Sequence, residues 1–193
     1  MFRILKAATL AAAVSLLALP AHAAVLLTVN VSDASAVTIT ATGDAADADA
    51  SIDSFTGVSL LDFFTRDLSL SVPASPSTGT LVSVAGDAPV NFAFSAALDR
   101  ALNLFDSADS GAFVFETGET AFAGSVTLDL SAFADLLPAA GTMGRIAIGD
   151  GFGGSPFGTE FGDFLVVDTI PLPAAAPLMM LGLVGLRVMR RRG

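Results

Sequence analysis

Hydrophobic and polar residues alternate in many short segments between residues 24 and 168. In each segment Val, Ile, Leu or Phe tends to occupy every second position, and small polar residues, often Thr or Ser, stand between them. An alternation of period two is typical of a β-strand that buries one face and exposes the other. The pattern predicts strands at residues 27–31, 37–42, 68–72, 81–84, 90–95, 113–115, 125–130, 145–148 and 164–167.

Turn-forming residues separate these segments, and they recur roughly every ten residues. Two other segments, 95–105 and 131–137, are predicted to be short helices. The second begins at Ser131, which can cap a helix, and it ends before Pro138. Because amphipathic helices are otherwise missing, the sequence predicts an all-β domain, an antiparallel β-sandwich that is jelly-roll-like or Ig-like.

Residues 1–23 have the composition of a secretory signal peptide. Two positive residues come first, an apolar run too short for a stable membrane span follows, and a proline ends that run. Ala21 and Ala23 then supply the small residues of a small–x–small cleavage site. We expect export through the Sec translocon and cleavage after Ala23.

Residues 170–193 form a second targeting segment at the other end of the chain, with three parts. A Pro-containing motif comes first, an apolar stretch over residues 178–186 follows, and a basic end closes the chain. A helix over residues 177–192 would be about 24 Å long, which is short against a hydrocarbon core of ~30 Å. The positive-inside rule places the arginines in the cytoplasm and the body of the protein outside. The motif is Ile170, Pro171, Leu172, Pro173 and Ala174, and the basic residues are Arg187, Arg190, Arg191 and Arg192.

This tail resembles the PEP-CTERM class of sorting signals, and in particular the VPLPA-CTERM variant, with Ile170 in place of Val. The resemblance covers residues 170–193 only. It implies processing by an exosortase, a membrane cysteine peptidase, in a Gram-negative bacterium that makes exopolysaccharide. It also implies a transient stay in the inner membrane before the protein reaches the cell surface or the extracellular space. A plain C-terminal membrane anchor is the alternative.

The charge of the chain is divided between the body, residues 24–169, and its flanking segments. All 19 acidic residues lie in the body, but only three of the nine basic residues do, and the difference, 3 − 19, is a formal charge of about −16. Such a surface repels nucleic acid and anionic lipid. Signal cleavage also removes the only Lys and the only His, and the chain has no Cys, Tyr or Trp. The usual side chains for proton transfer at neutral pH, thiolate attack and Schiff bases are then missing.

Four aspartates form the most suggestive cluster in the body. Asp44, Asp47, Asp49 and Asp53 offer oxygen ligands of the kind that Ca²⁺ prefers. An EF-hand is excluded because the loop has Ile and Val where the sixth and twelfth positions need Gly and Glu. The alternative is a solvated acidic turn between strands. A second pair, Asp106 and Asp109, leaves the same two readings open.

These observations together predict an exported, non-enzymatic protein with a structural or adhesive β-domain at the cell surface or in an exopolysaccharide matrix. One alternative is a Ca²⁺-dependent carbohydrate-binding module. Another is a secreted polysaccharide hydrolase based on two carboxylates, which would need a cleft with two acids about 5–9 Å apart and flanking aromatic residues. No cofactor is expected other than Ca²⁺ in the first alternative.

Overall fold

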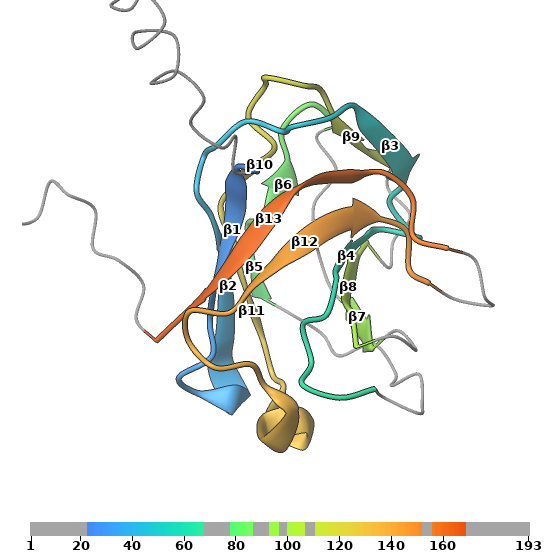
Figure 1. Ribbon diagram of the computed structural model, residues 1–193. Coiled ribbons are helices and arrows are strands. Elements are labelled where there is room, and N and C mark those ends of the chain that lie inside the picture. Colours follow the sequence, from blue (N-terminus) through green and yellow to red (C-terminus); the bar gives the residue numbers. More distant parts are fainter. Residues whose placement is uncertain are drawn as a thin grey trace, which may run out of the picture.

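A computed structural model describes residues 23–67, 78–86, 93–96, 100–106, 111–151 and 156–168. Figure 1 shows a strongly curled β-sheet with two smaller sheets beside it. None of the helices among the described residues is long and apolar enough to cross a membrane. The strands of the first half are β1 (Val25–Asn30), β2 (Val37–Ala41), β3 (Ala50–Asp53), β4 (Val58–Leu60), β5 (Thr78–Gly79), β6 (Val82–Ser83) and β7 (Ala93–Ala96). Those of the second half are β8 (Leu102–Phe105), β9 (Ala112–Phe115), β10 (Phe122–Ala123), β11 (Ser125–Leu128), β12 (Met143–Ile148) and β13 (Glu160–Val167).

In the described part of the chain the main sheet has nine strands, in the order β5-β11-β2-β1-β13-β12-β4-β8-β7. All neighbours in it are antiparallel except β1 and β13, which run parallel at its centre. The all-β prediction is therefore confirmed, but the sheet is mixed where a purely antiparallel one was predicted. Two antiparallel pairs, β3 with β9 and β6 with β10, form the smaller sheets. They contact each other and the main sheet.

A β-bulge explains how β1 buries two successive leucines. Leu26 and Leu27 are both buried, although neighbouring residues of a regular strand point to opposite faces. The register between β1 and β13 shifts between Val25 and Leu27, and a shift of one residue moves a side chain to the other face. The rest of β1 then alternates regularly between buried and partly buried positions.

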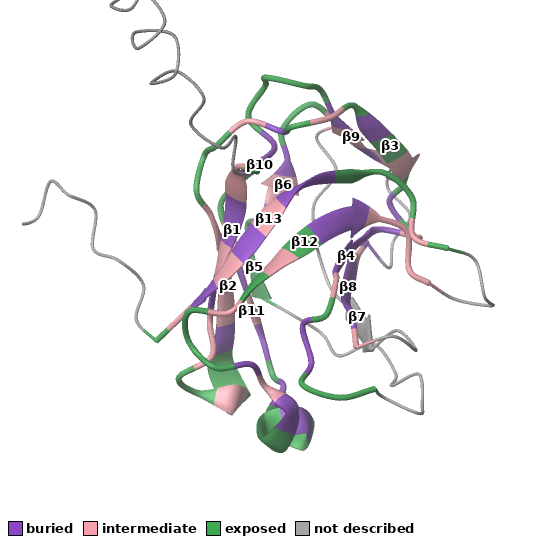
Figure 2. Cartoon of the chain, in the orientation of Figure 1, coloured by how far each residue is buried: buried purple, intermediate pink, exposed green. Residues whose placement is uncertain are grey.

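Phenylalanine side chains fill much of the interior, and Figure 2 shows that the buried residues follow the strands. One group joins the smaller sheets to the main sheet: Phe115 on β9 stacks on Phe161 of β13 with 4.0 Å between the ring centroids, and Phe122 on β10 lies 5.0 Å from Phe115. A second group links Phe63, Phe64, Phe133 and Phe164. Among the described residues, most of the largest fully buried side chains are phenylalanines.

The two helix predictions had different outcomes. Residues 131–137 do form a helix, the 3₁₀ helix η3 (Ser131–Leu136), but its N-cap is Leu130 and not Ser131. The side chain of Asp129 accepts a hydrogen bond from the Ser131 backbone N–H at 2.9 Å. A second 3₁₀ helix, η2 (Ala34–Ala36), joins β1 to β2.

The helix predicted at residues 95–105 is wrong, because β7 and β8 occupy the ends of that segment. Leu102, Asn103 and Leu104 are all buried, so both faces of β8 are covered. A strand with both faces buried loses the alternation by which strands are recognised. Arg100, just before β8, has a positive φ of 61°, which no helix accommodates.

Several predicted features lie outside the described residues. They are the signal sequence before Ala23 with Ala21, the complete tail at 170–193, the strand at 68–72, the start of the strand at 90–95, and Asp109.

Candidate functional site

Two loops cross at the end of the sheet where β1 begins, and most of the predicted acidic cluster lies on one of them. The first loop, residues 42–49, follows β2, and the second, residues 116–121, follows β9. Backbone hydrogen bonds join them: the Ala46 N–H donates to the Glu119 carbonyl at 2.9 Å, and the Gly118 N–H donates to the Ala46 carbonyl at 2.9 Å. The crossing fixes the backbone from which the acidic side chains project.

The aspartate side chains on and near these loops have different partners. Asp49 accepts hydrogen bonds from the backbone N–H and the hydroxyl of Thr117, both at 2.7 Å. These two donors, the backbone N–H first, lower the pKa of the Asp49 carboxyl below its ordinary value. Asp53 instead closes its own turn by accepting from the backbone N–H of Thr56 at 2.8 Å and from its hydroxyl at 2.9 Å.

Asp47 binds the start of the folded chain. Its Oδ2 accepts a hydrogen bond from the backbone nitrogen of Ala24 at 2.8 Å, and its own N–H donates to the Phe161 carbonyl of β13 at 2.9 Å. Asp47 thus lies between the first and last strands of the domain. The Asp44 carbonyl accepts from the Ala121 N–H at 3.1 Å, which ties the same loop to the crossing one.

The described residues contain no group of three or more Asp, Glu, His or Cys side chains placed to hold a metal ion. Three of the four predicted ligands, Asp47, Asp49 and Asp53, are each engaged with a different segment. A Ca²⁺ ion needs six to eight oxygens that converge. In the structure these carboxylates accept hydrogen bonds within the fold. The Ca²⁺ site stays a prediction, and a titration tests it.

Asp106, from the second acidic pair, is fully buried at the end of β8. Its backbone N–H donates to the Ser54 carbonyl at 2.8 Å, and the Ser54 hydroxyl accepts from the Gly111 N–H at 3.2 Å. Asp106 therefore lies between the β3–β4 turn and the start of β9. The sequence does not predict this burial, because it shows only an aspartate before a turn.

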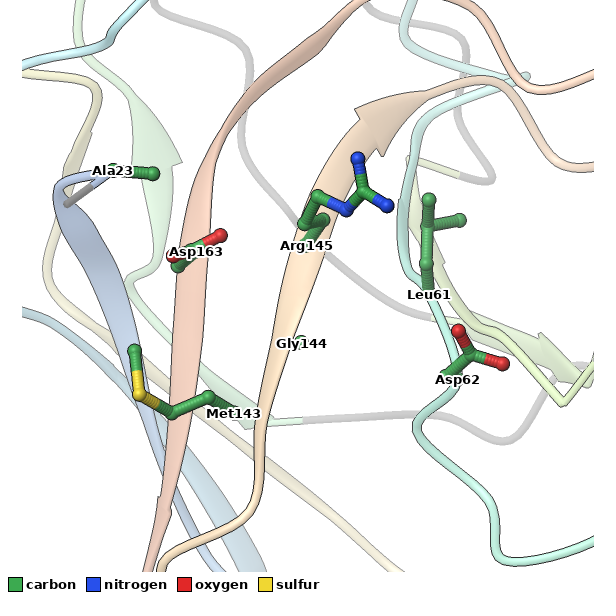
Figure 3. Close-up of a pocket in the computed structure, with 7 residues that line it drawn as sticks. All are labelled: Ala23, Leu61, Asp62, Met143, Gly144, Arg145 and Asp163. Atoms are coloured by element: carbon green, nitrogen blue, oxygen red, sulfur yellow. The ribbon is translucent and has the colours of Figure 1, made fainter. Parts of the chain in front are cut away.

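A groove of about 450 Å³ runs over β13, β12 and the segment that follows β4, beside Ala23, the first described residue. Figure 3 shows Arg145 on β12 between Asp163 of β13 and the segment with Asp62. Arg145 forms an ion pair with Glu160, and Asp62 forms one with Arg100. The residues that line the groove are Ala23, Leu61, Asp62, Met143, Gly144, Arg145 and Asp163.

The groove combines two carboxylates with a guanidinium, but none of the described residues that line it is aromatic. The predicted hydrolase cleft needs aromatic residues beside its two acids, so this groove lacks one half of that arrangement. Sequence reasoning missed the groove because its residues come from four separate segments between Ala23 and Asp163. The one feature of the sequence that could have pointed to the groove is Arg145, because it is one of only three arginines in an acidic body.

A second hollow of about 400 Å³ lies beside the glycine-rich loop that follows β12, and its lining includes Gly149, Asp150 and Gly151. A buried polar network holds the start of this loop. The Ser59 hydroxyl donates to the Gly149 carbonyl at 2.6 Å, and the side-chain amide of Asn103 donates to the Val58 carbonyl at 3.2 Å. The positive φ angles of Gly149 and Gly151, 101° and 67°, show that these glycines serve the turn.

The chain enters and leaves the domain at opposite ends of the central strand pair. Because β1 and β13 are parallel, Val25 lies beside Asp163, near the start of β13, and Asn30 lies beside Val167 at its end. Residue 24, where the body follows the predicted signal, is therefore at the end with the crossing loops. The end of β13, which leads to the predicted tail, is at the other end of the pair (Figure 1).

Comparisons with known proteins give no relative for this chain: no protein-family model, curated protein or solved structure matches it.

Proposed function

We propose that this protein is exported, processed at both ends, and serves outside the cell through a structural or adhesive β-domain without catalytic activity. The observation that carries the proposal is the order of the two flanking segments around an acidic body. Residues 1–23 combine positive charge, an apolar run and a small–x–small site, and residues 170–193 combine a Pro-Leu-Pro motif, a short apolar stretch and arginines.

The arrangement of the domain is consistent with this route. The first strand begins at Val25 and the last ends at Val167, so the described fold lies between the two proposed targeting segments. Entry and exit lie at opposite ends of the β1–β13 pair. If the tail holds the domain at the membrane, the crossing loops face away from it. Asp44, Asp47, Asp49, Glu116 and Glu119 would then be presented to the surroundings.

We also propose that the curled main sheet and the two smaller sheets form the layers of a β-sandwich. The ring contacts of Phe115 and Phe122, on the smaller sheets, with Phe161 on the main sheet support two layers with an apolar interior between them.

The test of the function is the location and the mass of the mature protein. In a host with the exosortase, we expect the protein at the cell surface or in the medium, with its N-terminus at Ala24 and its C-terminus shortened within residues 170–193. In the same host without that enzyme, the full tail should remain and the protein should stay with the inner membrane. Recovery of chains that end at Gly193 in the processing-competent host would refute the sorting proposal.

A further inference from the structure

The backbone nitrogen of Ala24 already has a carboxylate partner in the structure. It donates to Asp47 Oδ2 at 2.8 Å, and this hydrogen bond joins residues 23 positions apart. The Ala24 carbonyl accepts from the Asp163 N–H at 2.8 Å, so both polar backbone groups of this residue are held. Ala23, the residue before it, is exposed. Ala24 is thus the first described residue whose backbone the fold fixes on both sides.

We infer that Asp47 is a binding site for the chain's own N-terminus, the α-ammonium group that cleavage after Ala23 creates on Ala24. This inference rests on the signal cleavage in the proposed function. Hydrolysis of the Ala23–Ala24 peptide bond turns a neutral amide N–H into an –NH₃⁺ group at the same position. The hydrogen bond to Asp47 becomes a charge-assisted ion pair, which is stronger than a bond between a carboxylate and a neutral donor.

The surroundings of Ala24 favour the positive charge. The Asp47 carboxylate on the crossing loop accepts a hydrogen bond from the Ala24 backbone nitrogen, and Asp163 on β13 adjoins the same residue through its backbone N–H. Among the described residues that line the groove beside Ala23, Arg145 on β12 is the one cation, and it is paired with Glu160. Asp62, across the groove, is paired with Arg100. A new ammonium group on Ala24 therefore meets the Asp47 carboxylate, while Arg100 and Arg145 already have acidic partners.

Backbone hydrogen bonds hold Asp47 and its loop in place before the ammonium group forms. The Asp47 N–H donates to the Phe161 carbonyl of β13 at 2.9 Å, and its loop is fastened to residues 116–121. The carboxylate is therefore held ready by the backbone before the N-terminus arrives. Cleavage would fix Ala24, the residue before β1, near the start of the parallel strand β13, and a retained signal sequence could supply only the neutral donor.

The chain allows an unusually direct test, because its only lysine lies in the signal sequence. After cleavage the α-amino group is the only amine, so reductive methylation with ¹³C-formaldehyde gives one NMR signal that reports its pKa. The sample is the chain from Ala24 to its own C-terminus, in detergent. We expect an α-amino pKa at least ~0.5 unit above the ordinary ~7.7–8.0, because an opposite charge nearby favours the charged form.

The matched variants are Asp47→Asn, which keeps an acceptor oxygen but removes the charge, and Asp44→Asn, which removes a charge from the same loop without touching the Ala24 hydrogen bond. Asp47→Asn should return the α-amino pKa to its value in the urea-unfolded chain, and Asp44→Asn should lower it by less than half as much. An α-amino pKa that is equal in the folded and unfolded chains, or that does not respond to Asp47→Asn, overturns the inference.

The two proposals can fail separately. If N-terminal sequencing of the protein from an exporting host gives a start other than Ala24, the proposed cleavage is wrong. The pairing is then still measured on a chain made to begin at Ala24 by removal of a fusion partner in vitro. If the exported chain begins at Ala24 but its amine titrates normally, the cleavage stands and the Asp47 site is refuted.

Discussion

Replacement of Phe161 by Ala tests whether the smaller sheets are held to the main sheet by the phenylalanine group. Phe161 has no exposed surface, stacks on Phe115 with ring centroids 4.0 Å apart, and lies 6.1 Å from Phe122. Phe→Ala at a buried site costs about 3–5 kcal/mol, since transfer free energy is lost and a cavity remains. Two ring contacts are lost as well, and such pairs contribute about 0.5–1.5 kcal/mol beyond their area. We therefore expect a loss in the upper part of that range.

Two further substitutions make the comparison specific. Phe161→Leu keeps much of the volume and should cost about 1–1.5 kcal/mol. Phe55→Ala removes a ring that is 59% exposed and touches Phe105 at its edge, and it should cost about 1 kcal/mol at most. The chain has no Trp or Tyr, so unfolding in urea has to be followed by far-ultraviolet circular dichroism.

The expected order of stability is wild type, Phe55→Ala, Phe161→Leu and then Phe161→Ala, with similar dependence on urea concentration for all four. In a thermal scan Phe161→Ala should melt roughly 10 °C or more below the wild type. If Phe161→Ala loses no more stability than Phe55→Ala, the ring does not occupy a packed interior. The stacking of the smaller sheets on the main sheet would then be wrong.

Three other predictions follow from local geometry and charge. Gly57 and Gly43 both have positive φ, but an added Cβ at Gly57 would lie 2.2 Å from the Leu104 carbonyl oxygen, whereas at Gly43 it would meet nothing within 4 Å. In urea unfolding, the free energy of unfolding should fall by about 1 kcal/mol for Gly43→Ala and by about 3 kcal/mol or more for Gly57→Ala. Equal losses would contradict the close approach of β8 to Gly57. Hydrogen bonds lower the pKa of the exposed carboxyls of Asp33, Asp49 and Asp129. The stability that these bonds contribute is present above the unfolded pKa near ~3.9 and is lost as pH falls through the lower folded pKa. The melting temperature should therefore fall from pH 5 to pH 2, and it should fall less steeply in an Asn variant at each of the three sites. Asp47, Asp49 and Asp53 bind different segments, so calorimetric titration with Ca²⁺ should show no heat and added Ca²⁺ should not raise the melting temperature. Saturable binding at micromolar Ca²⁺ that is lost in Asp49→Asn would instead support a calcium-binding module.

Several strands with one exposed face were predictable from the sequence, although β3 was not, and the strands with two buried faces were missed. β9 and β11 alternate strictly between partly buried and buried positions, and both were predicted. In β8 three successive residues are buried, so the same rule failed there. β5 and β10 have two residues each, too few for any periodicity. Local pattern thus reports the environment of a strand only when that environment differs between its two faces.

Pairing between distant strands and the partners of the aspartates were beyond local pattern. The parallel contact of β1 with β13 joins the two ends of the body, and no turn chemistry marks it. Four aspartates close together in sequence suggested a single metal site. However, the backbone at Asp47, Asp49 and Asp53 directs their carboxylates to Ala24, Thr117 and Thr56. Spacing in the sequence gives the supply of oxygen ligands, and tertiary contacts decide where each one binds.

The parallel pair also links the order of export to the completion of the fold. On the proposed export route β1 is among the first segments of the body to cross the membrane, yet one of its two sheet neighbours is β13, the last strand described in the body. The centre of the sheet therefore cannot close until Val167 has crossed, and contacts between such distant segments form slowly. Only Asp168 and Thr169 separate that strand from Ile170, a distance of about 10 Å at full extension. On the proposed route the apolar tail enters the membrane at the moment when the sheet becomes able to close. A short, transient anchor would hold the chain in place during that step, and processing of the tail would then release a domain whose first and last strands are already paired.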